Sequence, residues 1–129
     1  MNDRRGSARS ATDRGSTTLT TVLLTPVFVV VALMAFQGAL WTHARTEARV
    51  VARNSAALVA RSHADVGATE RSAIAMLDAD TDLADPRVDI VVNGGLVTAR
   101  VTGRAPGMIR GTSAGVDVVE AVPREGFRP

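Results

Sequence analysis

The sequence predicts an α+β protein in which a long N-terminal transmembrane helix continues into an amphipathic helix, which packs against a small three-stranded antiparallel sheet. Three features predict this class: a long uncharged apolar run, an Ala- and Arg-rich stretch with helical periodicity, and a C-terminal region of alternating β-branched and polar residues. The expected regions are a disordered cytoplasmic leader at 1–15, a transmembrane helix at 16–42, an extracytoplasmic helical region at 43–77 and a small antiparallel β-sheet region at 78–129.

The membrane segment rests on the run from Val22 to Trp41, which only Thr25, Pro26 and Gln37 interrupt. Twenty residues at the helical rise cover about 30 Å, the thickness of the hydrocarbon core of a bilayer. A surface helix of a soluble domain is apolar along one stripe only, whereas this run is apolar all round. It therefore predicts a single-pass membrane protein with the lipid bilayer as its first partner.

Individual residues of the span have expected roles. Trp41 lies at the membrane edge, where its ring suits an interfacial anchor. Pro26 removes one helical hydrogen bond, and the hydroxyl of Thr25 is expected to help satisfy the freed carbonyl. Small side chains near the end of the span favour close approach of a second helix. The candidate helix-packing residues are Pro26, Ala35, Gly38 and Ala39.

The charges that flank the span favour one orientation. Four Arg residues precede it and three follow it closely, a small excess that favours a cytoplasmic N-terminus. The leader is too short to form a functional domain, so export of the larger C-terminal part is the more sensible arrangement. We therefore expect a cell-membrane protein with its C-terminal domain on the extracytoplasmic side.

The helical region after the span is expected to be amphipathic. Arg45, Arg49 and Arg53 recur every four residues on one face. The opposite, inward face is predicted to comprise Ala44, Ala48, Val51, Ser55 and Leu58. A second helical stretch brings together Ala73, Ile74 and Leu77, with Gly67 as the expected bend or helix boundary.

Beyond this point the period changes to that of strands. The segment from Asp78 to Pro86 is expected to be an acidic loop, and strands are expected at 88–92, 96–102 and 115–122. Between the first two, Asn93 and Gly94 predict a type I′ hairpin turn, because both tolerate positive φ. Val97, Ala99 and Val101 alternate with polar residues, so this strand should have one buried face.

Composition and motifs give no sign of catalysis. The chain has no Cys and two distant His residues, and all fifteen basic residues are scattered Arg, which disfavours a nucleic-acid interface, a cofactor or a metal centre. No nucleophile elbow or phosphate-binding loop is present. Asp78, Asp80 and Asp82 resemble the start of a calcium loop, but Leu83 stands where such a loop needs Gly. A solvated acidic loop is the favoured interpretation, and calcium binding is the alternative.

The residues also carry a family resemblance. A polar leader ends in Asp13-Arg14-Gly15, an apolar helix with an early Pro follows, and LWTHARTEARVVARNSAALVAR leads into a strand-rich tail. This pattern resembles the TadE-like family, the minor pilins or pseudopilins of the Tad (Flp) type IV pilus assembly system, in its actinobacterial form. The resemblance spans roughly residues 13–125 and implies a pilin-like fold and a non-enzymatic role in assembly of a pilus or a related secretion machine.

The resemblance also implies a processing site. Cleavage by a prepilin peptidase would follow Gly15 and leave Ser16 as the new N-terminus; the alternative is that Gly15 is merely a small residue in a flexible leader. The family usually carries Glu at the fifth mature position, where this chain has Thr20, so the pairing of that carboxylate with a neighbouring subunit is not available. The implied partners are other pilin-like subunits, the assembly platform and the prepilin peptidase.

Two other functions remain open from the sequence. One is a single-pass membrane-tethered binding or adaptor module of the envelope. The other is a secreted protein with a conventional signal peptide, which the length of the apolar run disfavours because signal peptides have apolar cores of about 7–15 residues.

Overall fold

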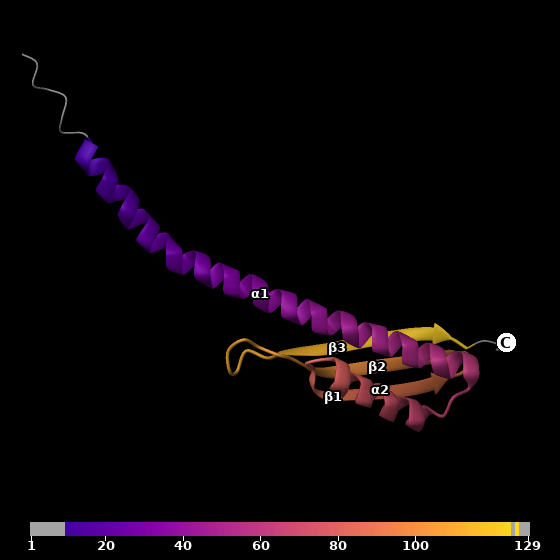
Figure 1. Ribbon diagram of the computed structural model, residues 1–129. Coiled ribbons are helices and arrows are strands. Elements are labelled where there is room, and N and C mark those ends of the chain that lie inside the picture. Colours follow the sequence, from indigo (N-terminus) through magenta and orange to yellow (C-terminus); the bar gives the residue numbers. More distant parts are fainter. Residues whose placement is uncertain (1–9, 125, 127–129) are drawn as a thin grey trace, which may run out of the picture. The chain divides into compact units, whose positions relative to one another are not determined.

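The computed structural model describes residues 10–124 and 126, and it confirms the predicted α+β class with a pilin-like arrangement. The elements in chain order are α1 (Ser10–Ser62), α2 (Val66–Asp80), β1 (Ala84–Asn93), β2 (Leu96–Ala105) and β3 (Ala114–Pro123). Figure 1 shows these elements along the chain. The chain divides into two units, residues 1–36 and 37–129, which are described in turn.

The first unit contains the N-terminal part of α1. The helix begins at Ser10, so residues 10–15 are helical where the sequence predicted disorder. Extending an existing helix requires no new nucleus, which accounts for growth of the helix into the polar leader. The rest of the predicted leader, residues 1–9, lies outside the described residues. From Thr20 to Phe36 every residue is exposed.

Pro26 lies inside α1 without ending it. The hydroxyl of Thr25 donates to the carbonyl of Thr21 at 2.8 Å. The carbonyl that Pro26 frees is that of Val22, four residues before it, so the predicted role of Thr25 is wrong by one position. A threonine hydroxyl in a helix can reach the carbonyl three or four residues before it, and Thr25 bonds the one four residues before.

The second unit begins at Gln37 and contains the break between the two helices. The helix α1 ends at Ser62, and His63 adopts a positive φ of 52°. Asp65 then caps α2, because its Oδ2 accepts a hydrogen bond from the backbone N–H of Ala68 at 2.7 Å. The boundary therefore precedes Gly67, which lies in the first turn of α2.

The C-terminal end of α2 corrects a second boundary. This helix continues to Asp80, so Asp78 and Asp80 belong to its last turn and only residues 81–83 connect it to β1. Thr81 ends the helix by donating its hydroxyl and its backbone N–H to the carbonyl of Leu77. The predicted acidic loop is thus mostly a helix end.

The three strands form one antiparallel sheet in the order β1-β2-β3, and each is longer than predicted. β1 already starts at Ala84, and its register shifts between Ala84 and Arg87. At the hairpin, Asn93 pairs with Leu96, which leaves Gly94 and Gly95 as the two turn residues, with Gly94 at φ 55°. The turn is therefore one residue later than predicted, because glycine adopts positive φ at less cost than asparagine.

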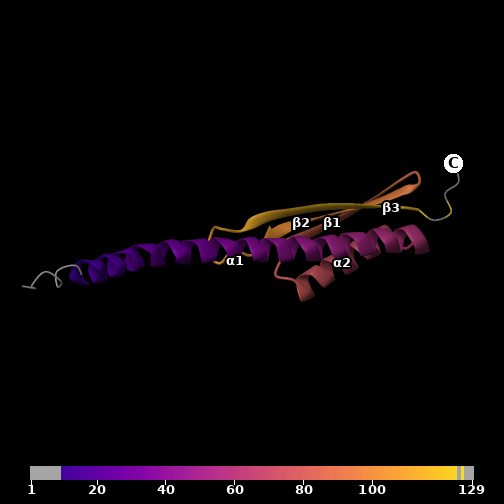
Figure 2. The same ribbon diagram turned by 90° about the horizontal axis from the view of Figure 1, so that it is seen from above.

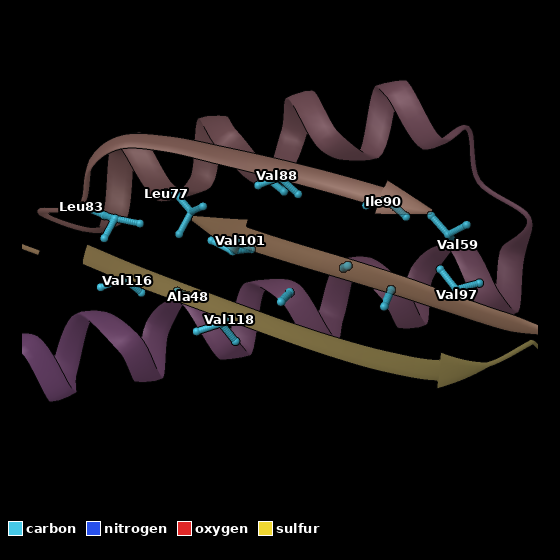
Figure 3. Packing of buried hydrophobic residues seen from close by; sticks show 14 of the residues in the cluster. Ala48, Val59, Leu77, Leu83, Val88, Ile90, Val97, Val101, Val116 and Val118 are labelled. Atoms are coloured by element: carbon cyan, nitrogen blue, oxygen red, sulfur yellow. The ribbon is translucent and has the colours of Figure 1, made fainter. Parts of the chain in front are cut away.

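The second unit has two layers. Figure 2 shows α2 and the C-terminal part of α1 on the same face of the sheet. Between the layers lies the core, in which Leu77, Val97 and Val101 are the largest fully buried side chains. Figure 3 shows Leu77 beside Val101 and Val88. The predicted alternation in β2 is confirmed, since Val97, Ala99 and Val101 are all buried.

The inward face of α1 consists of alanines, with one at almost every turn. The fully or nearly buried alanines are Ala44, Ala48, Ala52, Ala56 and Ala60. The predicted face was only partly correct, because Leu58 is 52% exposed and Val51 is half-buried, while Ala52 and Ala56 lie in the core. Small side chains let the helix backbone approach the sheet closely, so alanine is favoured over larger apolar residues there.

One edge of the sheet is covered by a helix. The backbone N–H of Ile90 on β1 donates to Glu70 Oε1 of α2 at 2.7 Å. An edge strand otherwise presents such groups to other chains, so Glu70 partly closes this edge. On the β3 side, Arg49 of α1 forms an ion pair with Glu120, with 2.9 Å between Nε and Oε1.

Candidate membrane anchor and the loop at its edge

The apolar segment of α1 is compatible with a membrane anchor. Among the described residues it is the one helix long and apolar enough to cross a bilayer. Its large side chains are exposed, and both Phe28 and Met34 are 70% exposed. A contiguous apolar surface of this kind is unfavourable in water, whereas lipid chains solvate it without cost. The geometry thus supports a single-pass anchor near the N-terminus.

Trp41 follows this segment and is held by two contacts. Its Nε1 donates to the carbonyl of Gly115 at the start of β3, at 3.1 Å. The guanidinium carbon of Arg45 lies 5.2 Å from the centroid of its ring, within the range of a cation–π contact. Its amphipathic ring is therefore fixed between the helix and the sheet, and its role as an interfacial anchor stays a prediction.

Gln37 lies one helical turn before Trp41 and has a function that sequence reasoning missed. Its Nε2 donates to the carbonyl of Thr112 at 3.1 Å, and its Oε1 accepts from the backbone N–H of Met108, also at 3.1 Å. One amide therefore holds both arms of the connection between β2 and β3. The sequence did contain one signal for this role, because the polar amide of Gln37 ends an apolar run and needs hydrogen-bond partners there.

We call residues 106–113 the β2–β3 loop, and its backbone is closed by internal hydrogen bonds. Thr112 donates its hydroxyl to the carbonyl of Ile109 at 2.7 Å and its backbone N–H to the same carbonyl at 3.0 Å. Gly107 makes this closure possible, because a Cβ there would clash with Thr112 Oγ1 and with the backbone of Thr112 and of the residue after it. Met108 and Ile109 point outward and are 51% and 62% exposed.

The candidate helix-packing residues lie on an open surface. Ala35, Gly38 and Ala39 are exposed, and a Cβ placed on Gly38 would meet nothing within 4 Å. Pro26 is exposed as well. This surface has room for a second helix, and its use for packing stays a prediction.

The predicted processing site lies in the first turns of α1. Gly15 and Ser16 are both helical. A peptidase that needs an extended backbone would have to open these turns first. Cleavage after Gly15 therefore stays a prediction, with opening of the helix as an added requirement.

Among the described residues, ionisable side chains pair on α1, between α1 and β3, and on the sheet. His43 Nε2 and Glu47 Oε1 lie 3.0 Å apart on α1, and both line an open groove beside Asp80. In the part of the chain that the structure describes, no three His, Asp or Glu side chains are placed to share a metal ion. The three Asp residues that suggested calcium are divided between the helix end and the following connection.

On the outer face of the sheet, Arg100 and Asp117 form a bidentate ion pair. Arg100 Nε lies 2.9 Å from Asp117 Oδ1, and Nη2 lies 2.5 Å from Oδ2. The hydrogen bonds and charge of Arg100 lower the pKa of Asp117 below its ordinary value, while Asp117 raises the pKa of Arg100. The pair joins β2 to β3 in a solvent-exposed position, so we assign it a structural role.

Comparison of the chain with protein-family models, with curated proteins and with solved structures finds no match. The residues described above provide an exposed apolar helix, an aromatic–arginine contact and a hydrogen-bonded loop. These contacts can hold a module at a membrane and position it.

Proposed function

We propose that the protein is a non-enzymatic minor pilin or pseudopilin that takes part in assembly of a Tad-type pilus or a related secretion machine. One observation carries the proposal: a single helix, α1, contains the apolar segment and also supplies the alanine face beneath a three-stranded antiparallel sheet. The family resemblance of the junction around Trp41 supports the same function.

The proposed mechanism is mechanical. The apolar segment of α1 is held in the bilayer with its N-terminus cytoplasmic, and it is later extracted or docked against the helices of other pilin-like subunits. The exposed small residues Gly38 and Ala39 give such helices room to approach. The outer face of the sheet, with Val91 and Val119 exposed, is available to the assembly platform or to other subunits.

The residue at position 20 favours a role in initiation or assembly over that of the main filament subunit. Thr20 has no carboxylate to pair with the terminal amine of a neighbouring subunit. A subunit of this kind can dock beside others through apolar contacts alone, which suits a component present in few copies.

The test is the N-terminus of the mature protein, determined by sequencing or intact mass in a host with a Tad system. The proposal expects Ser16 as the first residue, loss of this processing when the prepilin peptidase is deleted, and retention in membranes after alkaline extraction. Gly15→Val should block cleavage, and Gly6→Val in the same leader is the matched control that should not.

Other results would contradict the proposal in distinct ways. A mature chain that begins beyond residue 38 would indicate a conventional signal peptide. A membrane-bound chain with an intact leader would indicate a tethered envelope module. Release of the unprocessed chain by alkaline extraction would refute the membrane anchor itself.

A further inference from the structure

We propose that the β2–β3 loop is a second membrane contact. It inserts Met108 and Ile109 into the boundary between lipid headgroups and acyl chains, next to helix α1 of the same chain. The inference rests on the membrane-anchor part of the proposed function and is independent of any role in a pilus. The occupant of this apolar surface is therefore lipid, in the leaflet where Trp41 lies.

The first argument concerns depth. Gln37 directly follows Phe36, the last residue of the exposed apolar segment, and precedes Trp41 by four residues. Four residues of helix correspond to about 6 Å along the axis, so a Trp41 at the interface would put Gln37 up to about 6 Å deeper in the membrane. The amide of Gln37 holds Met108 and Thr112 directly, which places the loop at that depth.

The second argument concerns the backbone of the loop. Lipid offers no hydrogen-bond partners, so a backbone that enters it must satisfy its polar groups internally. The N–H groups of Met108, Ile109 and Thr112 all donate to protein acceptors, and the carbonyls of Ile109 and Thr112 both accept from protein donors. These five backbone groups, which include the contacts that close the loop and those that hold it to Gln37, are thus satisfied without water.

The third argument concerns charge. No acidic residue occurs from Arg104 to Val116, and Arg110 directly follows the exposed Ile109. Arginine beside exposed apolar side chains suits the interface, because its stem lies along the acyl chains while its guanidinium reaches lipid phosphates. Figure 1 shows the loop extending beyond the ends of β2 and β3, clear of the sheet.

Two other exposed apolar residues of the second unit, Val91 and Val119, do not share these properties. Val91 and Val119 are 44% and 55% exposed on the sheet, but each lies two residues after an aspartate, Asp89 or Asp117. Unlike the arginine of the loop, Arg100 on this face is already paired with Asp117 and is not free to reach lipid phosphates, so these positions should stay in water. They provide the matched control for the loop.

The test uses the full chain, which has no natural cysteine and so accepts single labels. Met108→Cys and Ile109→Cys report on the loop, Val119→Cys on the sheet and Met34→Cys on the span. Each variant carries an environment-sensitive fluorophore in liposomes of phosphatidylethanolamine and phosphatidylglycerol. Quenching is then measured with a lipid-attached quencher and with aqueous iodide.

The expected result is several-fold stronger lipid quenching, and several-fold weaker iodide quenching, at positions 108 and 109 than at 119. Iodide quenching at 108 and 109 equal to that at 119, with position 34 in lipid, would overturn the inference while leaving the anchor intact. Protection from both quenchers would also overturn it, because a protein surface would then cover the loop. Iodide access at position 34 as well would refute the anchor and thus the proposed function.

A second variant tests how the loop is positioned. Gln37→Ala removes both amide hydrogen bonds, so the label at position 108 should become several-fold more accessible to iodide while the label at 34 does not change. Unchanged iodide quenching of the label at position 108 in the Gln37→Ala protein would overturn the positioning role assigned to this amide.

Discussion

Replacing Leu77 by alanine tests whether the core lies where the structure places it. Leu77 is fully buried in α2 beneath Val101, whereas Leu58 of α1 is 52% exposed. The sequence grouped each leucine with other apolar residues of its helix, and only the structure shows that Leu77 is buried and Leu58 exposed. Leu58→Ala is therefore a matched control with the same change of side chain.

The expected difference follows from burial. Leu→Ala in a packed core costs about 3–5 kcal/mol, because transfer energy is lost and a cavity remains. At Leu58 half of the side chain is already in solvent, and alanine is the better helix former, so we expect less than about 1 kcal/mol. A small domain has a total stability of roughly 5–15 kcal/mol, so the first change removes a large share and the second does not.

Hydrogen exchange followed by mass spectrometry on the full chain in nanodiscs measures this difference. A loss of about 3 kcal/mol corresponds to a more than hundredfold faster exchange of the most protected β2 amides. The Leu58→Ala protein should exchange within a few-fold of the unaltered chain. Equal acceleration in both variants, or none at Leu77→Ala, would refute the assignment of the core.

Three further predictions address packing, the sheet edge and charge. Ala52→Leu should overpack the contact between α1 and the sheet and lower stability by about 1–3 kcal/mol in the same exchange measurement. Glu70→Ala should speed exchange of the Ile90 amide several-fold in a residue-resolved NMR measurement, while Glu70→Gln, which keeps an acceptor, should not. The pKa of Asp117, followed by NMR, should lie below its ordinary 3.8 and rise towards it in Arg100→Met. Because the folded pKa is the lower one, the contribution of the pair to stability is complete above the ordinary pKa and is lost as pH falls through the folded value.

Most of the fold could be predicted from the local periodicity of apolar residues in the sequence. The alternation in β2 placed Val97 and Val101 in the core, because successive side chains of a strand point to opposite faces. The face of α1 was harder to predict, because an alanine-rich helix gives little contrast between its sides. The prediction favoured the larger Leu58, whereas close packing against the sheet selected Ala52 and Ala56.

The contacts at the edge of the span could not be predicted from sequence. Gln37 bonds to Thr112, 75 positions away, and Trp41 bonds to Gly115, 74 positions away. Local patterns do not encode pairings at such separation, which depend on how the sheet packs on the helix. The local signal was the apolar pair Met108-Ile109 in an otherwise small and polar connection.

The position of Gln37 bears on the choice between a retained and a secreted protein. A conventional signal peptidase acting beyond residue 38 would remove this amide and leave the N–H of Met108 and the carbonyl of Thr112 without their partner. Cleavage after Gly15 keeps it. The core alanines begin at Ala44 on the same helix, and the module has no disulfide to compensate for a weakened contact. The β2–β3 loop depends on Gln37, which belongs to the apolar run. The structure therefore favours a protein that retains this run over one from which it is cleaved.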